Sequence, residues 1–133
     1  MFIIKKGFQD EIIKHVQATS PSEACGILAG RRGKVDKIYQ MKNTSDKPEI
    51  CYFMDPKEQL EVMKEIRNLG QEMVGIYHSH TENEAYPSAR DLELAFYPDA
   101  YYIIISLKDK KNPSIRAFRI VEGKISEEEI ITK

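Results

Sequence analysis

The chain has 133 residues, of which 41% are hydrophobic and 31% charged, which is typical of one globular domain. Its 20 basic and 21 acidic side chains give a net charge of -1 without a block of one sign, so the basic patch of a nucleic-acid-binding protein is not expected. No apolar stretch suits a membrane span or a signal peptide, and two cysteines, Cys25 and Cys51, are too few for a disulfide scaffold. We therefore expect a single domain, residues 1–133, in the cytoplasm.

The first half of the chain predicts several strands and one amphipathic helix. Apolar residues at helical spacing indicate a helix over Gly7–Ala18. A run of small apolar residues, Ala24–Gly30, is typical of a buried strand that is entered directly from Glu23. The other elements expected here are strands at Phe2–Lys5 and Val35–Met41 and a hairpin turn at residues 31–34.

The second half adds two helices and further strands. Asp55 as N-cap, Pro56 at the first helical position and Gly70 as a stop delimit the longer helix. An apolar strand over Val74–His80 follows, and then a short helix from Ser88 to about residue 96. The remaining segments are a polar loop at 43–49 and strands at Ile50–Met54, Ala100–Leu107, Ser114–Val121 and Lys124–Ile131. Strands and helices are mixed without strict alternation, which predicts an α+β or mixed α/β domain around one sheet.

Two histidines stand two positions apart at the end of the Val74–His80 strand. Alternate side chains of a strand leave the same face, so His78 and His80 would project together, about 7 Å apart along the backbone. The carboxylate of Asp91 would return to them after a turn at Tyr86-Pro87. Two imidazoles and one carboxylate leave one tetrahedral corner of a zinc ion open, as in catalytic zinc sites. The pattern therefore predicts a metal-dependent peptidase site.

Each part of this pattern also has a purely structural interpretation. A His-x-His pair occurs at polar strand edges and as a hydrogen-bonded core pair, and Ser88-x-x-Asp91 fits a helix capping box. The capping role is compatible with metal ligation, because a cap fixes the helix end and thereby aims Asp91. Ser79 faces away from the two histidines and is interpreted as structural. The third histidine, His15, borders the apolar face of the first helix and is interpreted as a surface or packing residue.

The five polar positions together resemble the signature of the JAMM (MPN+) metallopeptidases of the Mov34/MPN/PAD-1 family: Glu23, His78, His80, Ser88 and Asp91. The surrounding segments Ser22–Gly30 and Val74–His80 are similar to the stand-alone bacterial and archaeal members. The resemblance implies a single MPN domain with a central mixed sheet flanked by helices, related to the cytidine-deaminase-like fold. It also implies one zinc ion held by His78, His80 and Asp91, with water as the fourth ligand.

The resemblance further implies the catalytic roles. Spacing alone does not identify a general base among 21 acidic residues, and Glu82 and Glu84 lie nearer the histidines in sequence. The family match implies that Glu23 takes a proton from the zinc-bound water and passes it to the departing amine. The hydroxyl of Ser88 would stabilise the tetrahedral oxyanion. Thr81 departs from the family pattern, which often has proline there, and this leaves the shape of the following loop open.

The substrate implied by the resemblance is a ubiquitin-like, sulfur-carrier protein, cut at the amide bond after its C-terminal Gly-Gly. Two alternatives stay open: an isopeptidase that removes conjugated ubiquitin-like proteins from lysines, and a non-catalytic MPN scaffold. A zinc deaminase is disfavoured, because that class uses His-x-Glu with Cys-x-x-Cys and neither occurs here. The sequence does not indicate an oligomeric state.

Overall fold

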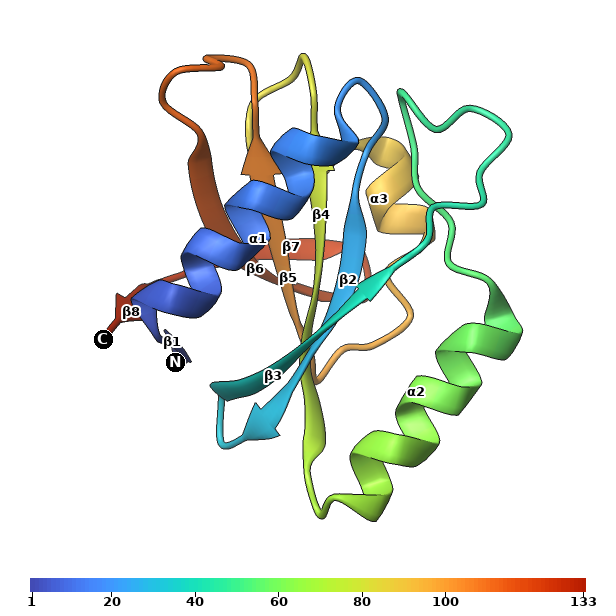
Figure 1. The fold of residues 1–133 in the computed structure, drawn as a ribbon, viewed down its shortest axis with the longest axis vertical. Helices are drawn as coiled ribbons and strands as arrows, with labels where there is room; N and C mark the ends of the chain where they lie inside the picture. The colour runs from blue at the N-terminus through green and yellow to red at the C-terminus, as the bar shows by residue number, and fades with distance from the viewer.

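The computed structural model describes residues 1–133 and contains one eight-stranded mixed sheet with three helices (Figure 1). In chain order the elements are β1 (Phe2–Ile4), α1 (Lys6–Thr19), β2 (Cys25–Arg31), β3 (Lys34–Met41), α2 (Pro56–Asn68), β4 (Glu72–His80), α3 (Ala89–Glu93), β5 (Tyr101–Ser106), β6 (Ser114–Val121), β7 (Lys124–Glu128) and β8 (Ile130–Thr132). The expected mixed α/β class is confirmed. No helix combines the length and the apolar character that a membrane span needs.

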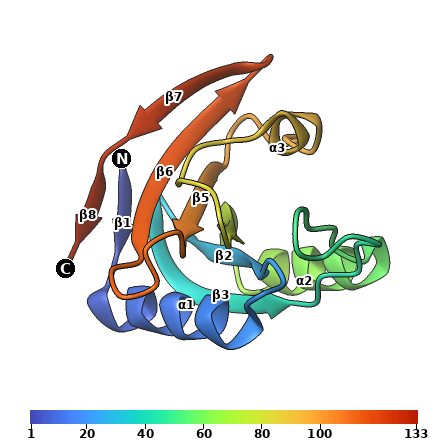
Figure 2. The same ribbon diagram turned by 90° about the horizontal axis from the view of Figure 1, so that it is seen from above.

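The two ends of the sheet belong to one C-terminal segment. The strand order is β7-β6-β5-β4-β2-β3-β1-β8, and only Glu129 separates β7 from β8. The segment pairs antiparallel with β6 through its first part and parallel with β1 through its second. Figure 2 shows the strong curvature of the sheet that accompanies this arrangement, with the two termini close together. The first and last strands of the chain are thereby tied to one another.

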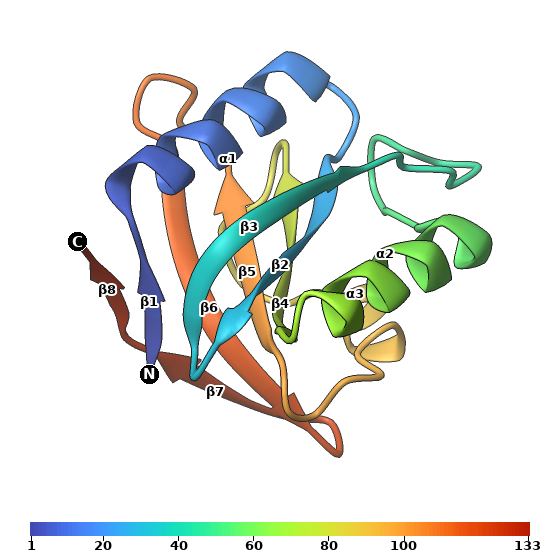
Figure 3. The same ribbon diagram turned by 60° about the horizontal axis from the view of Figure 1, so that its bottom comes forward.

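The two larger of three hydrophobic clusters lie on the two faces of the sheet. One is formed between the sheet and α1, and it includes Ile12, Val16 and Tyr77. The other includes Ile66 of α2 and Ile76 of β4, with side chains of α3 and its following loop packed against it. Figure 2 shows α1 and α3 on opposite sides of the molecule, and Figure 3 shows α1 apart from α2. Strand β4 contributes to both cores because its side chains alternate between the faces.

Most element boundaries agree with the local sequence signals. The side chain of Asp55 accepts a hydrogen bond from the Lys57 N–H at 3.2 Å, and α2 begins at the following proline, as predicted. Gly70 ends this helix with a φ of 69°. The turn between β2 and β3 has positive φ at both Arg32 (53°) and Gly33 (77°), which matches the twist of the hairpin that it closes.

Three predicted elements differ from the structure. Residues 50–54 do not form a strand, and only Met54 makes an isolated bridge, with Asn43. The helix after Ser88 ends at Glu93, because the chain turns toward Tyr97-Pro98 and packs its apolar side chains beside α2. The predicted strand 124–131 is interrupted at residue 129, where the segment leaves β6 and joins β1.

Gly26 of β2 lies directly against the ring of Tyr77 of β4, and a substitution at Gly26 tests this packing. A Cβ atom at Gly26 would lie 2.1 Å from Cε2 of Tyr77, whose ring is fully buried and whose hydroxyl is hydrogen-bonded to Nδ1 of His15 at 2.7 Å. We expect Gly26→Ala to lower the free energy of unfolding by about 1–3 kcal/mol through overpacking, measured by urea denaturation. The control is Gly7→Ala in α1, where a Cβ meets nothing within 4 Å. Equal stability of the two variants would contradict this account.

Candidate metal centre

Three side chains from β4 and α3 converge on one point. Nε2 of His78 lies 3.2 Å from Nε2 of His80. The two carboxylate oxygens of Asp91 lie 3.1 Å from His78 and 3.0 Å from His80, respectively. All three side chains are buried. The structure thus brings together the three ligands predicted from the sequence, and they could hold one metal ion.

The hydrogen bonding of His80 indicates that a cation fits among the two Nε2 atoms and the carboxylate of Asp91. Its Nδ1 lies 2.9 Å from the carbonyl oxygen of Glu84, so Nδ1 carries a proton and donates it, as ligating histidines usually do. In the neutral ring, Nε2 then presents a lone pair toward the carboxylate of Asp91. Lone pairs at this separation repel each other unless a proton or a cation lies among them. Ligands around a tetrahedral zinc ion with bonds of about 2.0–2.1 Å are themselves about 3.3 Å apart, and the 3.2 Å between the two Nε2 atoms fits this value.

A helix cap holds Asp91 in place. The Ser88 N–H donates to Oδ2 of Asp91 at 2.9 Å, and the Asp91 N–H donates to the Ser88 hydroxyl oxygen at 3.1 Å. This is the predicted capping box, so Asp91 serves the cap and faces the histidines at once. Burial alone would raise the pKa of Asp91, but the neighbouring His78 and the hydrogen bond from the Ser88 N–H lower it. The carboxylate is therefore available as a ligand.

The orientation of His78 depends on a residue that sequence reasoning missed. Its Nδ1 is buried without a hydrogen-bond partner, although ligating histidines usually donate from their second nitrogen. The ring instead stacks on Tyr52, with centroids 4.5 Å apart and an interplanar angle of 26°. Tyr52 is 26 positions away from His78 in sequence and carries no motif, so no local signal could have identified it.

Glu23 is a buried carboxylate beside this cluster. Only 4% of the residue is exposed, and its Oε1 has no hydrogen-bond partner. Burial raises the pKa of Glu23 to about 8, with the charge of His80 opposing this rise and that of Asp91 adding to it. A nearby cation would favour the ionised carboxylate. The free oxygen is suited to accept a hydrogen bond from a water molecule bound beside the cluster.

Backbone contacts fix the chain on both sides of Glu23. Its N–H donates to the carbonyl of Pro48 at 2.7 Å, and its carbonyl accepts from Nδ2 of Asn43 at 2.9 Å. The next N–H, of Ala24, donates to the hydroxyl of Ser79 at 2.8 Å. Ser79 therefore has a structural role, as predicted, and that role is to attach the Glu23 segment to β4.

The other polar residues named by the sequence lie at the margin of the cluster or away from it. Ser88 is exposed, and its hydroxyl keeps a proton free to donate, because it acts only as an acceptor in the cap. His15 contacts Tyr77 on the opposite face of the sheet and takes no part in the cluster. Thr81 donates to the carbonyl of Glu49 at 3.5 Å, so its hydroxyl links the loop after β4 to the loop before α2.

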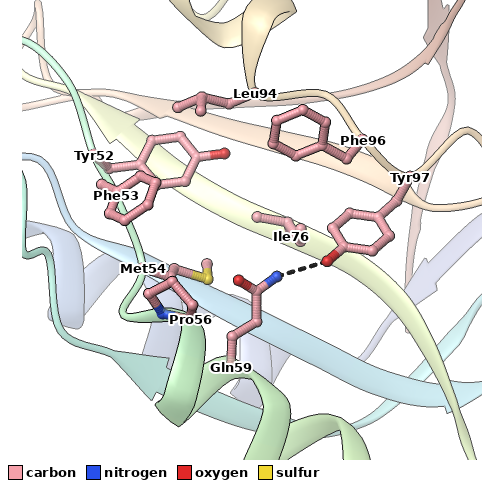
Figure 4. A pocket seen from close by; sticks show the side chains of 9 residues that line it. All are labelled: Tyr52, Phe53, Met54, Pro56, Gln59, Ile76, Leu94, Phe96 and Tyr97. Carbon is pink, nitrogen blue, oxygen red and sulfur yellow. Dashed lines mark hydrogen bonds between the residues drawn. The ribbon is translucent and has the colours of Figure 1, made fainter.

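An apolar groove begins next to the metal cluster. Its cavity of about 190 Å³ lies between the start of α2, β4 and the loop after α3. The lining, drawn in Figure 4, consists of Tyr52, Phe53, Met54, Pro56, Gln59, Ile76, Leu94, Phe96 and Tyr97. Gln59 closes one side by donating to the hydroxyl of Tyr97 at 2.8 Å. Tyr52 lines the groove and also stacks on His78, so this side chain borders both the groove and the cluster.

Comparison with known proteins places these features in a family. The family model described as prokaryotic homologs of the JAB domain matches residues 5–121. The chain is 36% identical over 132 residues to a CysO-cysteine peptidase of Mycobacterium tuberculosis, covering 98% of this chain and 90% of that protein. It is 35% identical over 104 residues to a desampylase of Haloferax volcanii, covering 74% and 75% of the two chains.

A solved structure gives the same result for the fold. A protein from Desulfitobacterium hafniense, determined in solution, superimposes with a TM-score of 0.89 at 39% sequence identity. The match covers 100% of this chain and 93% of the other. The sheet order and helix placement are therefore shared over the whole length of the chain.

Substitutions of the three converging side chains test whether they bind a metal ion. We expect His80→Ala and Asp91→Asn to weaken zinc affinity by more than about 100-fold, since the loss of an outer partner alone costs about 10–100-fold. Elemental analysis after zinc reconstitution measures this, and the rise in melting temperature on adding zinc gives a second readout. His15→Gln is the matched histidine control and should bind zinc as the native chain does. Full zinc occupancy in His80→Ala would contradict the three-ligand site.

Proposed function

The chain belongs to the family of prokaryotic homologues of the JAB domain, within the JAMM/MPN proteins, and from this we propose its reaction and substrate. It is a zinc-dependent hydrolase that cleaves the amide bond after the C-terminal Gly-Gly of a ubiquitin-like, sulfur-carrier protein. The observation that carries this proposal is the convergence of His78, His80 and Asp91 beside the buried Glu23, which has one carboxylate oxygen free. A metal site with an adjacent unpaired base is what hydrolysis of an amide requires.

The proposed chemistry divides between the metal and the protein. When bound, zinc lowers the pKa of its water to about 7 and polarises a carbonyl oxygen. Glu23 takes the proton of the attacking water and delivers it to the departing amine, a role that is supported by its burial and its free Oε1. The exposed Ser88 donates its free hydroxyl proton to the oxyanion that develops on the substrate.

The groove shown in Figure 4 is suited to the substrate tail. Its lining is almost wholly apolar and reaches the metal cluster through Tyr52. An extended tail with apolar residues ahead of its glycines could lie there, with the glycine end directed at His78. Phe53 and Phe96 are exposed at this groove and could contact the folded part of the carrier.

Space for the leaving group is available in a second cavity, which borders the cluster at His80. This polar cavity of about 450 Å³ is lined by His80, Ser88 and Lys108, among others. It is open enough for a linear C-terminal extension, and also for a lysine side chain in an isopeptide bond. The isopeptidase alternative is therefore kept, and the name of the desampylase relative is consistent with either form.

The proposed partner is supported by the relatives, which are named a CysO-cysteine peptidase and a desampylase. A non-catalytic scaffold is disfavoured because every ligand position is filled and the ligands converge. We also propose that residues 1–133 form one domain, supported by the pairing of β1 with β8 from the opposite end of the chain. A cytoplasmic location is proposed because both cysteines are free thiols.

The base proposed here can be tested by an isosteric change. We expect Glu23→Gln to lose about 10²–10⁴-fold in kcat, because it removes the acid–base group, and to keep its zinc, because it removes no ligand. Cleavage rate and zinc content are measured on the same preparation. The control is Glu82→Gln, an exposed acidic residue close to the histidines in sequence, which should keep native activity. Native turnover by Glu23→Gln would show that another group is the base.

The substrate class is tested with a defined carrier. The zinc-loaded protein is incubated with a ubiquitin-like protein whose Gly-Gly end bears a short C-terminal peptide, and separately with the same protein joined to a lysine side chain. Intact mass spectrometry should show loss of the extension, and replacing Gly-Gly by Ala-Ala should abolish it. If neither substrate changes mass while zinc is bound, the proposed function is wrong.

A further inference from the structure

Asn43 makes an unusually complete set of hydrogen bonds at the start of the loop 44–53. Its Nδ2 donates to the carbonyls of Glu23 at 2.9 Å and Cys51 at 3.0 Å, with a longer contact to Pro48 at 3.4 Å. Its Oδ1 accepts from the N–H groups of Ser45 at 3.0 Å and Phe53 at 3.1 Å. Two donor protons and two lone pairs are the full capacity of an asparagine amide. The side chain is thus saturated, although it lies in a polar and half-buried loop.

These bonds join two parts of the site that are distant in sequence. The Nδ2 arm of the amide joins the Glu23 carbonyl to the Cys51 carbonyl of the loop, and a second link runs from the Glu23 N–H to Pro48 within the loop. The other arm holds the loop at Ser45 and Phe53, the residues near its two ends. Between these attachments the loop presents Tyr52, which stacks on His78. The base and one wall of the apolar groove therefore share a single side-chain anchor.

We propose that Asn43 is a positioning residue of the reaction, which fixes the backbone of Glu23 to the loop 44–53 and so aligns the base with the bound substrate tail. The inference rests on the proposed function, in which Glu23 is the base and the groove holds the tail. A hydrogen bond contributes only about 1 kcal/mol of stability, but a displacement of about 1 Å in a reacting group can cost about 10²-fold in rate. The effect of losing Asn43 should accordingly be larger on turnover than on folding.

Substitutions of Asn43 can remove its Nδ2 donor and its Oδ1 acceptor separately or together. Asn43→Asp keeps an oxygen that accepts from Ser45 and Phe53, but it replaces the Nδ2 donor by an oxygen that faces the Glu23 and Cys51 carbonyls, so the link between Glu23 and the loop is lost while both loop ends stay held. Asn43→Ala removes both arms. Asn68→Asp makes the same chemical change at the exposed end of α2 and controls for the added charge.

The experiment measures kcat and KM on the extended Gly-Gly carrier, zinc content, global stability and amide hydrogen exchange. In Asn43→Asp we expect native zinc content, a kcat lower by about 10–100-fold, and little change in KM. The Ser45 and Phe53 amides should stay protected while the Glu23 amide exchanges faster. In Asn43→Ala the Ser45 and Phe53 amides should also lose protection and KM should rise, because the groove wall is released.

Two results would overturn the inference. One is a kcat of Asn43→Asp equal to that of Asn68→Asp; the other is a loss of activity that merely follows global stability and returns on cooling. If the wild-type protein cleaves no carrier, the proposed function fails separately. Amide hydrogen exchange alone then tests whether Asn43 fixes Glu23 to the loop 44–53. Faster exchange of the Glu23 amide in Asn43→Asp supports this link, and unchanged exchange refutes it.

Discussion

The backbone ladder that holds β4 between β2 and β5 sets the direction of the side chains at the metal cluster. His78 is paired with Cys25 on one side and Ile104 on the other. A slip of one residue would turn both histidines toward α1. Tyr77 and Ser79 oppose such a slip on the α1 face, where Tyr77 is hydrogen-bonded to His15 and Ser79 to the Ala24 N–H. The core beneath α1 therefore holds in register a site that lies on the other face.

The parts of this arrangement that could be predicted from sequence depend on residues close together in the chain. Alternation along one strand places His78 and His80 on a common face, and a capping box needs only Ser88 and Asp91. The start of α2 likewise follows from Asp55 and the proline after it. Each of these features is decided within one strand or one helical turn, where geometry is nearly independent of the rest of the fold.

The parts that could not be predicted depend on contacts between distant segments. Glu23 was identified only through family resemblance, since nothing in its own spacing distinguishes it among the acidic residues. Tyr52 and Asn43 lacked any signal. The loss of the expected strand at residues 50–54 has the same origin, because the Asn43 side chain satisfies the Phe53 N–H and the Cys51 carbonyl that a neighbouring strand would have paired. When one side chain makes the hydrogen bonds that a neighbouring strand would otherwise make, the sequence shows no periodic pattern that reveals it.

The cluster concentrates hydrogen-bond acceptors in a place where water is largely excluded. Burying the carboxylates of Glu23 and Asp91 is costly unless each is compensated. The Ser88 N–H offsets part of this cost at Asp91, while Oε1 of Glu23 has no partner within the protein. A divalent cation with its water would relieve the repulsion among the histidine and aspartate lone pairs and give Glu23 a donor. The group that supplies the chemistry would then also stabilise the fold around it. For the same reason, the ladder of β4 and the cap of α3 must hold mutually repelling groups together until the cation binds.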